Sequence, residues 1–237
     1  MIDLLWCDGT WSTPTSRSAV SDALRRTMDG SRVRFVYVDY PATYGPATGV
    51  GDESFGDSVG DGVQALARAV EASPNLAIVG GYSQGAAVAV DYARTILPTS
   101  PLHEVLAVVA LGNPHQPTHL GRSGIAGPLD VPRPLVSVYA PGDPIADLPG
   151  GSPLRTIADV TEWMSLRSLE DAHRWAVTTA EKVAKARLQA WWKPWRWQDL
   201  NSAQDYALEY LLGTAHTTDY VDGGHVERLA RRIEALA

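Results

Sequence analysis

Five hydrophobic segments recur through the first 142 residues. Each is nearly continuous rather than alternating with polar residues, which is typical of strands buried on both faces of a parallel sheet. They are IDLLWC (2–7), VRFVYVDY (33–40), NLAIVGGY (75–82), EVLAVVALG (104–112) and PLVSVYAPG (134–142). Helix-length stretches separate the first four, at 16–29, 58–73 and 84–98. Because strands that alternate with helices form βαβ units, the pattern predicts an α/β fold with a central parallel sheet.

The pattern changes after the last of these segments. From Leu154 to Gly213 there is little Gly or Pro and the apolar spacing becomes helical. Six of the eight tryptophans occur there: Trp163, Trp175, Trp191, Trp192, Trp195 and Trp197. The segment 223–236 that ends the chain has the pattern of an amphipathic helix. We therefore predict an α/β domain made of 1–154 and 214–237, with a mostly helical, Trp-rich subdomain inserted at 155–213.

Composition and charge narrow the class of protein. Of the 237 residues, 45% are hydrophobic and 20% charged, as in an ordinary soluble globular protein. The net charge of −7 argues against nucleic acid as a partner, since phosphate binding needs a basic surface. The single cysteine, Cys7, allows no internal disulfide, and no apolar run has the roughly 18 residues of a transmembrane segment. MIDLLWCDGT (1–10) lacks the pattern of a signal peptide, so we expect a cytosolic product, or one exported by a route that the sequence does not show.

One short motif carries candidate chemistry. GYSQG (81–85) matches G-x-S-x-G, follows the apolar run LAIVG and opens a helical stretch, which is the context of a nucleophile elbow. In such an elbow Ser83 sits on a strained turn, and glycines on either side prevent collisions with the neighbouring strand and helix. The alternative is an ordinary strand-to-helix turn in which small residues serve packing alone. The flanking strand and helix favour the elbow, with Ser83 as nucleophile.

A nucleophilic serine needs a base and a group that orients the base. In α/β-hydrolases the chain order is serine, acid, histidine, and Asp143 directly follows the last predicted strand. Asp147 is the spare candidate, and a plain Gly-Asp-Pro turn is the alternative interpretation of Asp143. Two histidines follow in the right order: His216 in a loop and His225 at the start of the last helix. A loop position is easier to aim at the serine, so His216 is preferred while His225 stays open.

Other residues suggest an oxyanion hole but no metal site. The N–H of Gln84 follows the serine, and Thr10, in the loop DGTW, can offer an N–H and a hydroxyl; a simple β-turn is the alternative for that loop. Cys7 is a weaker candidate nucleophile, because a thiol inside an apolar strand stays protonated. His115 and His119 have the spacing of ligands on a helix, but two nearby prolines disfavour a helix there. We therefore expect neither a metal ion nor a cofactor.

Taken together, the motifs resemble a known family. LLWCDGTW (4–11), GGYSQGAAVAVDYA (80–93), ALGNPHQP (110–117), VYAPGDPIAD (138–147) and a late His before an amphipathic helix occur in the order and at the spacing of cutinase-like serine esterases. Within that group the chain most resembles mycobacteriophage lysin B, the mycolylarabinogalactan esterases. The resemblance implies a three-layer α/β-hydrolase sandwich with a helical subdomain inserted between the acid and the histidine.

The resemblance also implies roles for individual residues. The positions that match the family's nucleophile, acid, base and two oxyanion donors are, in that order, Ser83, Asp143, His216, Thr10 and Gln84. HTTDY (216–220) has one residue more than the family's usual H-x-x-Y, which keeps His225 as an alternative base.

The implied substrate is an ester with a long acyl chain. In the lysin B family it is the bond joining mycolic acids to arabinogalactan, whose cleavage detaches the outer membrane of a mycobacterial host and completes phage lysis. The basic, Trp-rich segment 182–197 would form an interfacial lid against that membrane, or alternatively the core of its own subdomain. We expect a monomer made in the host cytoplasm. The alternatives are a general carboxylesterase or lipase and a non-catalytic wall- or lipid-binding module.

Overall fold

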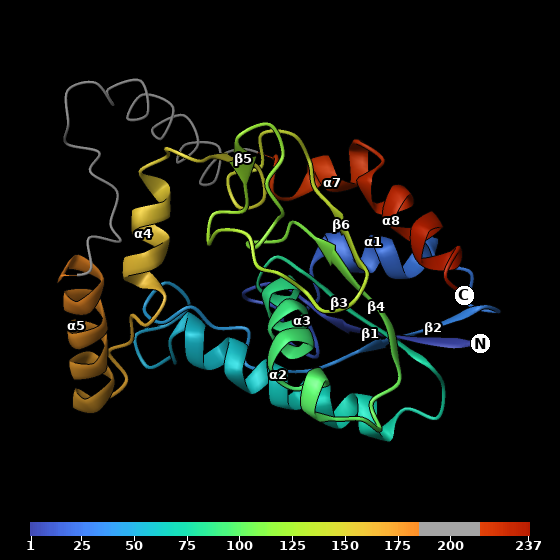
Figure 1. Cartoon of the computed structure of the whole chain (residues 1–237), viewed down its shortest axis with the longest axis horizontal. Helices are drawn as coiled ribbons and strands as arrows, with labels where there is room; N and C mark the ends of the chain where they lie inside the picture. The colour runs from blue at the N-terminus through green and yellow to red at the C-terminus, as the bar shows by residue number, and fades with distance from the viewer. Residues whose placement is uncertain (185–213) are drawn as a thin grey trace.

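A five-stranded parallel sheet forms the centre of the molecule. The computed structural model describes residues 1–184 and 214–237, and the strand order is β2-β1-β3-β4-β6. The strands are β1 (Ile2–Cys7), β2 (Val33–Tyr37), β3 (Ala77–Tyr82), β4 (Val105–Leu111) and β6 (Leu135–Val138). Each lies within one of the five hydrophobic segments, so the predicted α/β class is confirmed (Figure 1).

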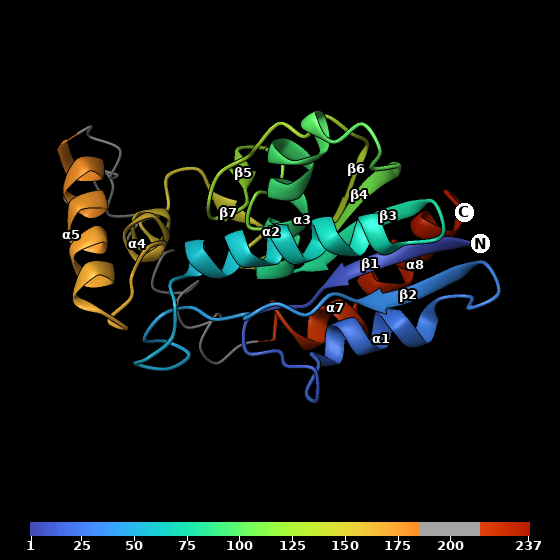
Figure 2. The same cartoon turned by 90° about the horizontal axis from the view of Figure 1, so that it is seen from below.

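Helices cover both faces of the sheet and make three layers. On one face lie α1 (Ala19–Thr27), α7 (Thr218–Asp222) and α8 (His225–Glu234), and on the other α2 (Phe55–Ala72) and α3 (Gln84–Thr95), as Figure 2 shows. A 3-10 turn, η1 (Leu97–Thr99), follows α3. Each face has its own hydrophobic core: in β1, Leu4 and Trp6 pack toward one and Leu5 and Cys7 toward the other. The strands therefore read as continuous hydrophobic runs because both of their faces are buried.

The segment between β4 and β6 is rich in Gly and Pro but is not a plain loop. It contains the short strand β5 (Arg122–Ser123), which pairs antiparallel with β7 (Leu148–Pro149). The guanidinium of Arg155, at the start of α4 (Leu154–Thr161), ties these strands together. It donates to the backbone carbonyls of Ser123, Gly124, Ile125, Leu148 and Pro149. Arg155 therefore anchors the loops that flank Asp143.

The helices α4 and α5 (Leu169–Ala184) form an arm beside the sheet domain (Figure 1). The arm contacts the segment that leads into α2. The N–H of Gly56 donates to the carbonyl of Glu162 at 2.9 Å, and a Cβ at Gly56 would lie only 2.7 Å from the ring of Trp163. Arg174 on α5 pairs with Asp57 on α2, with 2.9 Å between Nη1 and Oδ1. Polar contacts and one tryptophan therefore fix the arm to the α/β domain.

The arm is the described part of the predicted insertion. Both of its tryptophans, Trp163 and Trp175, are half-buried, and the indole N–H of Trp175 donates to the carbonyl of Val160 at 2.9 Å. These two side chains therefore pack within the arm or against its support. The other four tryptophans, and all of 182–197 beyond α5, lie outside the described residues, so a separate subdomain at 155–213 and its role as a lid stay predictions. Among the helices of the described ranges, none is long and apolar enough to cross a bilayer.

Candidate active site

Ser83 stands on the turn between β3 and α3 in a rare backbone conformation. Its φ of 55° and ψ of −119° lie outside the regions that non-glycine residues normally adopt. Two glycines make this turn feasible. A Cβ at Gly81 would lie 2.1 Å from the carbonyl carbon of Gly85, and a Cβ at Gly85 would lie 2.0 Å from the carbonyl oxygen of Cys7. The turn therefore has the close backbone packing and the strain of a nucleophile elbow.

Three side chains from distant parts of the chain meet at the carboxyl edge of the sheet. The Nε2 atom of His216 lies 2.8 Å from the Oγ atom of Ser83. Its Nδ1 atom lies 2.9 Å and 3.0 Å from the two carboxylate oxygens of Asp143. Asp143 is fully buried in the loop after β6 and also accepts the N–H of Ile145 at 2.7 Å. Hydrogen bonds thus run continuously from serine to imidazole to carboxylate, the arrangement that makes a serine nucleophilic.

The competing candidates lie elsewhere. Asp147 pairs with the guanidinium of Arg122 at 2.7 Å and accepts the N–H of Gly142 at 2.8 Å. His225 is buried at the start of α8, where burial lowers its pKa, and its Nδ1 has no partner among the described residues. Burial likewise raises the pKa of the Cys7 thiol. The geometry thus brings His216 and Asp143, rather than His225 and Asp147, to Ser83.

The extra residue in HTTDY has a structural explanation. His216 precedes α7, and Tyr220 follows it by about one helical turn, so both side chains reach the same side of the site. The hydroxyl of Tyr220 donates to Oδ2 of Asp143. Tyr82, next to the serine, stacks on the His216 ring at 5.3 Å between centroids and donates to its backbone carbonyl. Sequence reasoning assigned no role to either tyrosine, although both stand inside the motifs it used.

The candidate oxyanion donors lie in the loop after β1 and at the first residue of α3. The N–H of Gln84 is the first of α3, where helix geometry supplies no carbonyl partner. The hydroxyl of Thr10 donates to the side-chain oxygen of Gln84 at 2.9 Å. The side-chain amide of Gln84 in turn donates to the carbonyl of Thr43 at 2.8 Å. Since that hydroxyl proton is engaged with Gln84, the backbone N–H is the donor that Thr10 has left for a substrate.

Asp8 holds the Thr10 loop in place, a role that sequence reasoning missed. Its buried carboxylate accepts four donors from the loop and from α1 and its cap: the N–H of Gly9, the N–H and hydroxyl of Ser18, and the hydroxyl of Ser21. A Cβ at Gly9 would lie 3.3 Å from Cβ of Ser83, so the loop passes directly beside the serine.

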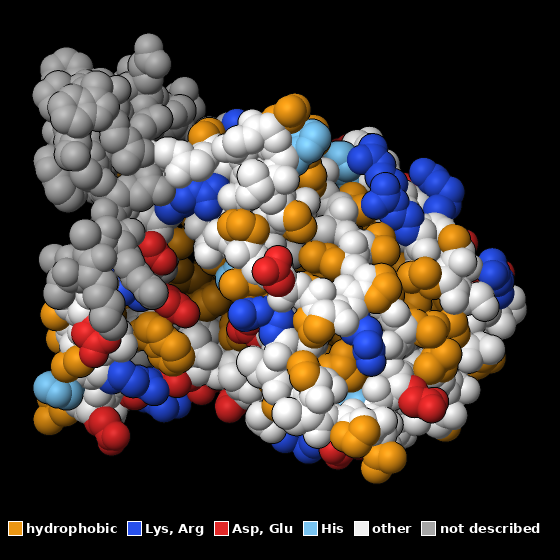
Figure 3. Space-filling view, viewed as in Figure 1, with side chains coloured by type: hydrophobic (Ala, Val, Ile, Leu, Met, Phe, Trp, Pro, Cys, Tyr) orange, Lys and Arg blue, Asp and Glu red, His pale blue; other side chains and the backbone are white. Residues whose placement is uncertain are grey.

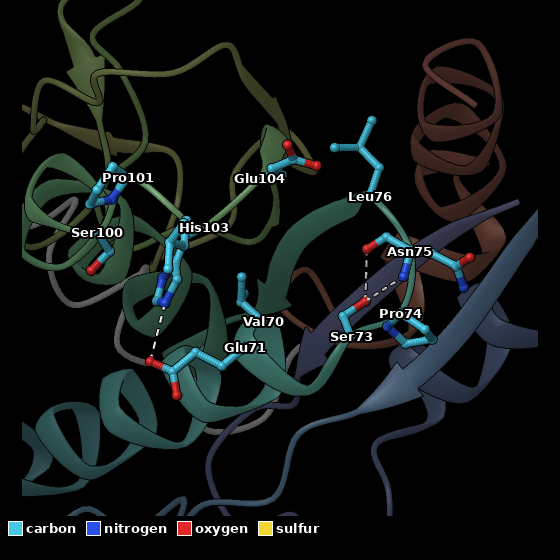
Figure 4. A pocket seen from close by; sticks show the side chains of 11 residues that line it. Val70, Glu71, Ser73, Pro74, Asn75, Leu76, Ser100, Pro101, His103 and Glu104 are labelled. Carbon is cyan, nitrogen blue, oxygen red and sulfur yellow. Dashed lines mark hydrogen bonds and ion pairs between the residues drawn. The ribbon is translucent and has the colours of Figure 1, made fainter.

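Two hollows differ in their relation to this site. A cavity of about 600 Å³ lies where β3 and β4 begin, between Leu76 and Glu104 (Figure 4). There His103 already bonds the hydroxyl of Tyr92 at 2.7 Å and approaches Glu71 at 3.3 Å. This end of the sheet is opposite Ser83, so the cavity is not a substrate site for the serine. Figure 3 instead shows a recess between the arm and the sheet domain, with hydrophobic side chains visible inside.

Metal ligands do not cluster in the part of the chain that the structure describes. Within residues 1–184 and 214–237, no group of three or more His, Cys, Asp or Glu side chains is placed to hold an ion. His115, one of the two histidines with helical spacing, instead contacts the carbonyl of Gly127 at 2.9 Å.

Solved structures with a similar fold include one that matches nearly the whole chain. Lysin B from Mycobacteriophage D29 has a TM-score of 0.61 and 18% identity, covering 95% of this chain and 98% of that chain. A cutinase-like protein from Cryptococcus sp. has a TM-score of 0.44 and 20% identity, covering 80% and 97%. The catalytic core of acetyl xylan esterase from Trichoderma reesei has a TM-score of 0.47 and 17% identity, covering 76% and 97%. At such identities the likeness concerns the fold alone.

The family follows from the sequence itself. No curated protein matches the chain. The model of the Cutinase family, however, matches residues 9–152, which is more than half of the chain and includes Ser83 and Asp143. The protein therefore belongs to the cutinase family of serine ester hydrolases.

Proposed function

We propose that this esterase hydrolyses the bond between mycolic acids and arabinogalactan of the mycobacterial cell wall during phage lysis. The observation that carries the proposal is the extent of the likeness to D29 lysin B. The cutinase match ends at residue 152, whereas the structural likeness covers 95% of this chain and 98% of that chain. It therefore reaches into the segment that separates Asp143 from His216. In this proposal the protein is a monomer made in the host cytoplasm that acts on the envelope at lysis.

The proposed mechanism begins with attack by Ser83. His216 Nε2 takes the hydroxyl proton as Oγ bonds to the ester carbonyl carbon, and the carbonyl electron pair moves onto oxygen. The N–H groups of Gln84 and Thr10 stabilise that oxyanion, and each such donor is typically worth about 10²–10³ in rate. When the carbonyl re-forms, the bond to the sugar oxygen breaks, and that oxygen takes the proton from His216. The products of this step are the free alcohol and an acyl-serine.

Water completes the cycle. His216 removes a proton from a water molecule, which attacks the acyl-serine and forms a second oxyanion. Its collapse releases the carboxylic acid, and Oγ of Ser83 recovers its proton from His216. Asp143 remains ionised throughout, holds the imidazole in the required tautomer and stabilises the imidazolium.

The surroundings of the serine suit a long apolar acyl chain. Trp11 lies next to Thr10 and is 59% exposed, although its φ of 67° is unfavourable for a bulky residue. Strain that keeps an apolar side chain in solvent beside a reactive serine supports contact with substrate. The recess between the arm and the sheet domain offers further apolar surface (Figure 3).

A general cutinase-like carboxylesterase is the second candidate. The family match favours it, because 9–152 holds the elbow and the acid and does not depend on the inserted segment. The third idea, a binding module without activity, fits the site poorly. A retired site has no need of a strained Ser83 hydrogen-bonded to His216.

The first experiment is hydrolysis of a series of p-nitrophenyl esters by the native chain and by Ser83→Ala, His216→Ala and His225→Ala. We expect Ser83→Ala and His216→Ala to lose at least 10³-fold in kcat and His225→Ala to retain activity. Equal activity of the native chain and Ser83→Ala would contradict the mechanism. Release of mycolic acids from purified mycobacterial wall then separates the candidates. Activity on soluble esters with none on the wall would support the general carboxylesterase.

A further inference from the structure

The carboxylate of Asp143 receives more hydrogen bonds than a catalytic acid needs for orientation. Within the described residues, its donors are the N–H of Ile145, the Nδ1–H of His216 and the hydroxyl of Tyr220. The first two come from the acid's own loop and from the base. The third comes from a side chain with no contact to Ser83 in the described structure, so it acts on the serine only through the acid and the base.

Tyr220 is built to donate and not to ionise. Its side chain is fully buried, and burial together with the charge of Asp143 raises its pKa well above the usual value. A phenol that never loses its proton is a permanent donor to the carboxylate. Because the acceptor is ionised and buried, the bond is of the strong, charge-assisted kind.

Neighbouring rings fix Tyr220 in this position. The titratable groups that contact it come from four segments: Asp143 after β6, His216 before α7, Tyr82 on β3 and His225 on α8. Tyr82 and His216 meet its ring edge-on, at 5.9 Å and 6.2 Å between centroids. The backbone at Gly112 also closes on it, since a Cβ there would lie 3.1 Å from the hydroxyl oxygen.

We propose that Tyr220 is a positioning residue that sets the proton affinity of His216 through Asp143. The inference rests on the proposed triad and adds a member that never touches the substrate. By donating to Oδ2, Tyr220 holds the carboxylate plane in the orientation in which both oxygens face Nδ1 of His216. It also withdraws electron density from the carboxylate and so weakens the stabilisation of the imidazolium.

The sign of the effect can be tested with Tyr220→Phe. Loss of the hydroxyl leaves Asp143 a stronger acceptor, which stabilises the imidazolium of His216 more strongly. The acid limb of the kcat/KM profile should move to higher pH by about half a unit to one unit. At the plateau kcat should fall about tenfold with KM nearly unchanged, since the acid is less well held. The readout is p-nitrophenyl butyrate hydrolysis between pH 5 and 9.

Two matched variants isolate the contact. Tyr37→Phe removes a hydroxyl that donates to a carboxylate outside the triad, Asp22, and should leave the profile unchanged. Tyr82→Phe removes a hydroxyl from the same aromatic cluster, but its partner is the carbonyl of His216. It should alter kcat without moving the acid limb. If the acid limb of the kcat/KM profile lies at the same pH for the native chain and Tyr220→Phe, the inference is overturned.

A second substitution keeps the test sound if Tyr220→Phe folds poorly. Replacing Tyr220 alone with 3-fluorotyrosine keeps the ring and hydroxyl but makes the phenol a stronger acid and donor. The acid limb should then move to lower pH, opposite to the shift in Tyr220→Phe. A purely structural tyrosine would give no such pair of opposite shifts. Full activity in Ser83→Ala would refute the triad itself. If Ser83→Ala is inactive but the acid limbs of the Tyr220 variants match that of the native chain, only the role of Tyr220 is refuted.

Discussion

The closest backbone approach in the site makes Gly85→Ala a demanding test of the elbow. Gly85 lies in the first turn of α3, and a Cβ there would stand 2.0 Å from the carbonyl oxygen of Cys7 and 2.4 Å from its carbon. Ordinary van der Waals contact begins near 3.4 Å, so α3 would have to retreat by more than 1 Å from β1. The obstacle is backbone inside a parallel sheet, so no side-chain rotation relieves it.

The magnitude follows from two opposing terms. Alanine is favoured over glycine inside a helix by about 1 kcal/mol. Overpacking a rigid core, with the backbone shifts that it forces, costs about 1–3 kcal/mol. The upper end of that cost, less the helix preference, leads us to expect Gly85→Ala to lower the free energy of unfolding by about 2 kcal/mol. Because Ser83 and the N–H of Gln84 move with the helix, and a displacement of about 1 Å can cost 10²-fold in rate, kcat should fall about 100-fold.

Gly60→Ala provides the control. Gly60 is an exposed position within α2, and a Cβ there meets nothing within 4 Å. The same substitution should raise the free energy of unfolding by about 0.5–1 kcal/mol and leave kcat unchanged. Urea unfolding followed by circular dichroism and p-nitrophenyl butyrate kinetics measure both variants. The packing argument fails if Gly85→Ala is as stable and as active as the native chain.

Three further predictions concern other parts of the molecule. The Arg34 guanidinium and neighbouring hydroxyl and amide donors lower the pKa of the buried Asp3 carboxyl to about 2. The ionised carboxylate therefore contributes about 2 kcal/mol to the free energy of unfolding above pH 4, and this contribution is lost as the pH falls through 2. Asp3→Asn should thus be less stable than the native chain in urea unfolding at pH 7, and the difference should shrink toward pH 2. Arg155→Met should lower the free energy of unfolding by about 3 kcal/mol, seen as a lower Tm, because several carbonyls lose their donors. Trp11→Ala should reduce the preference for long-chain over short-chain p-nitrophenyl esters about tenfold, whereas Leu102→Ala, which removes an exposed apolar side chain at the opposite end of the sheet, should not.

The sequence predicted the sheet and the elbow because both depend on local patterns. Hydrophobic segments buried on two faces mark parallel strands wherever they occur. G-x-S-x-G between a strand and a helix points to Ser83 because each of its glycines avoids a steric clash close by. A Cβ at Gly81 would collide with Gly85, and a Cβ at Gly85 would collide with Cys7 on the adjacent strand β1. Asp143 could be predicted for a similar reason: it directly follows a strand, and the carboxyl ends of all parallel strands lie at one edge of the sheet.

The choice of partners around that edge needed three dimensions. Asp147 stands four residues from Asp143, and only the position of Arg122 on β5 shows that its carboxylate is already paired. The strand β5 itself has two residues, too few to give a periodic signal, and it exists because β7 lies opposite. Likewise, the hydroxyl of Thr10 is committed to the side chain of Gln84, 74 positions away, which no sequence spacing reveals.

The aromatic residues around His216 show why the base was hardest to assign. From sequence alone, the tyrosine of HTTDY (216–220) served only to compare its spacing from the histidine with the family's H-x-x-Y. The additional residue therefore counted against His216 as the base. In the structure the hydroxyl of this tyrosine, on α7, donates to Asp143. A tyrosine about one helical turn after the histidine meets this requirement, because a helix brings residues three and four apart to the same face. A hydroxyl that donates to Asp143 and a ring beside His216 can therefore come from several spacings in a short helix, so the added residue does not count against His216.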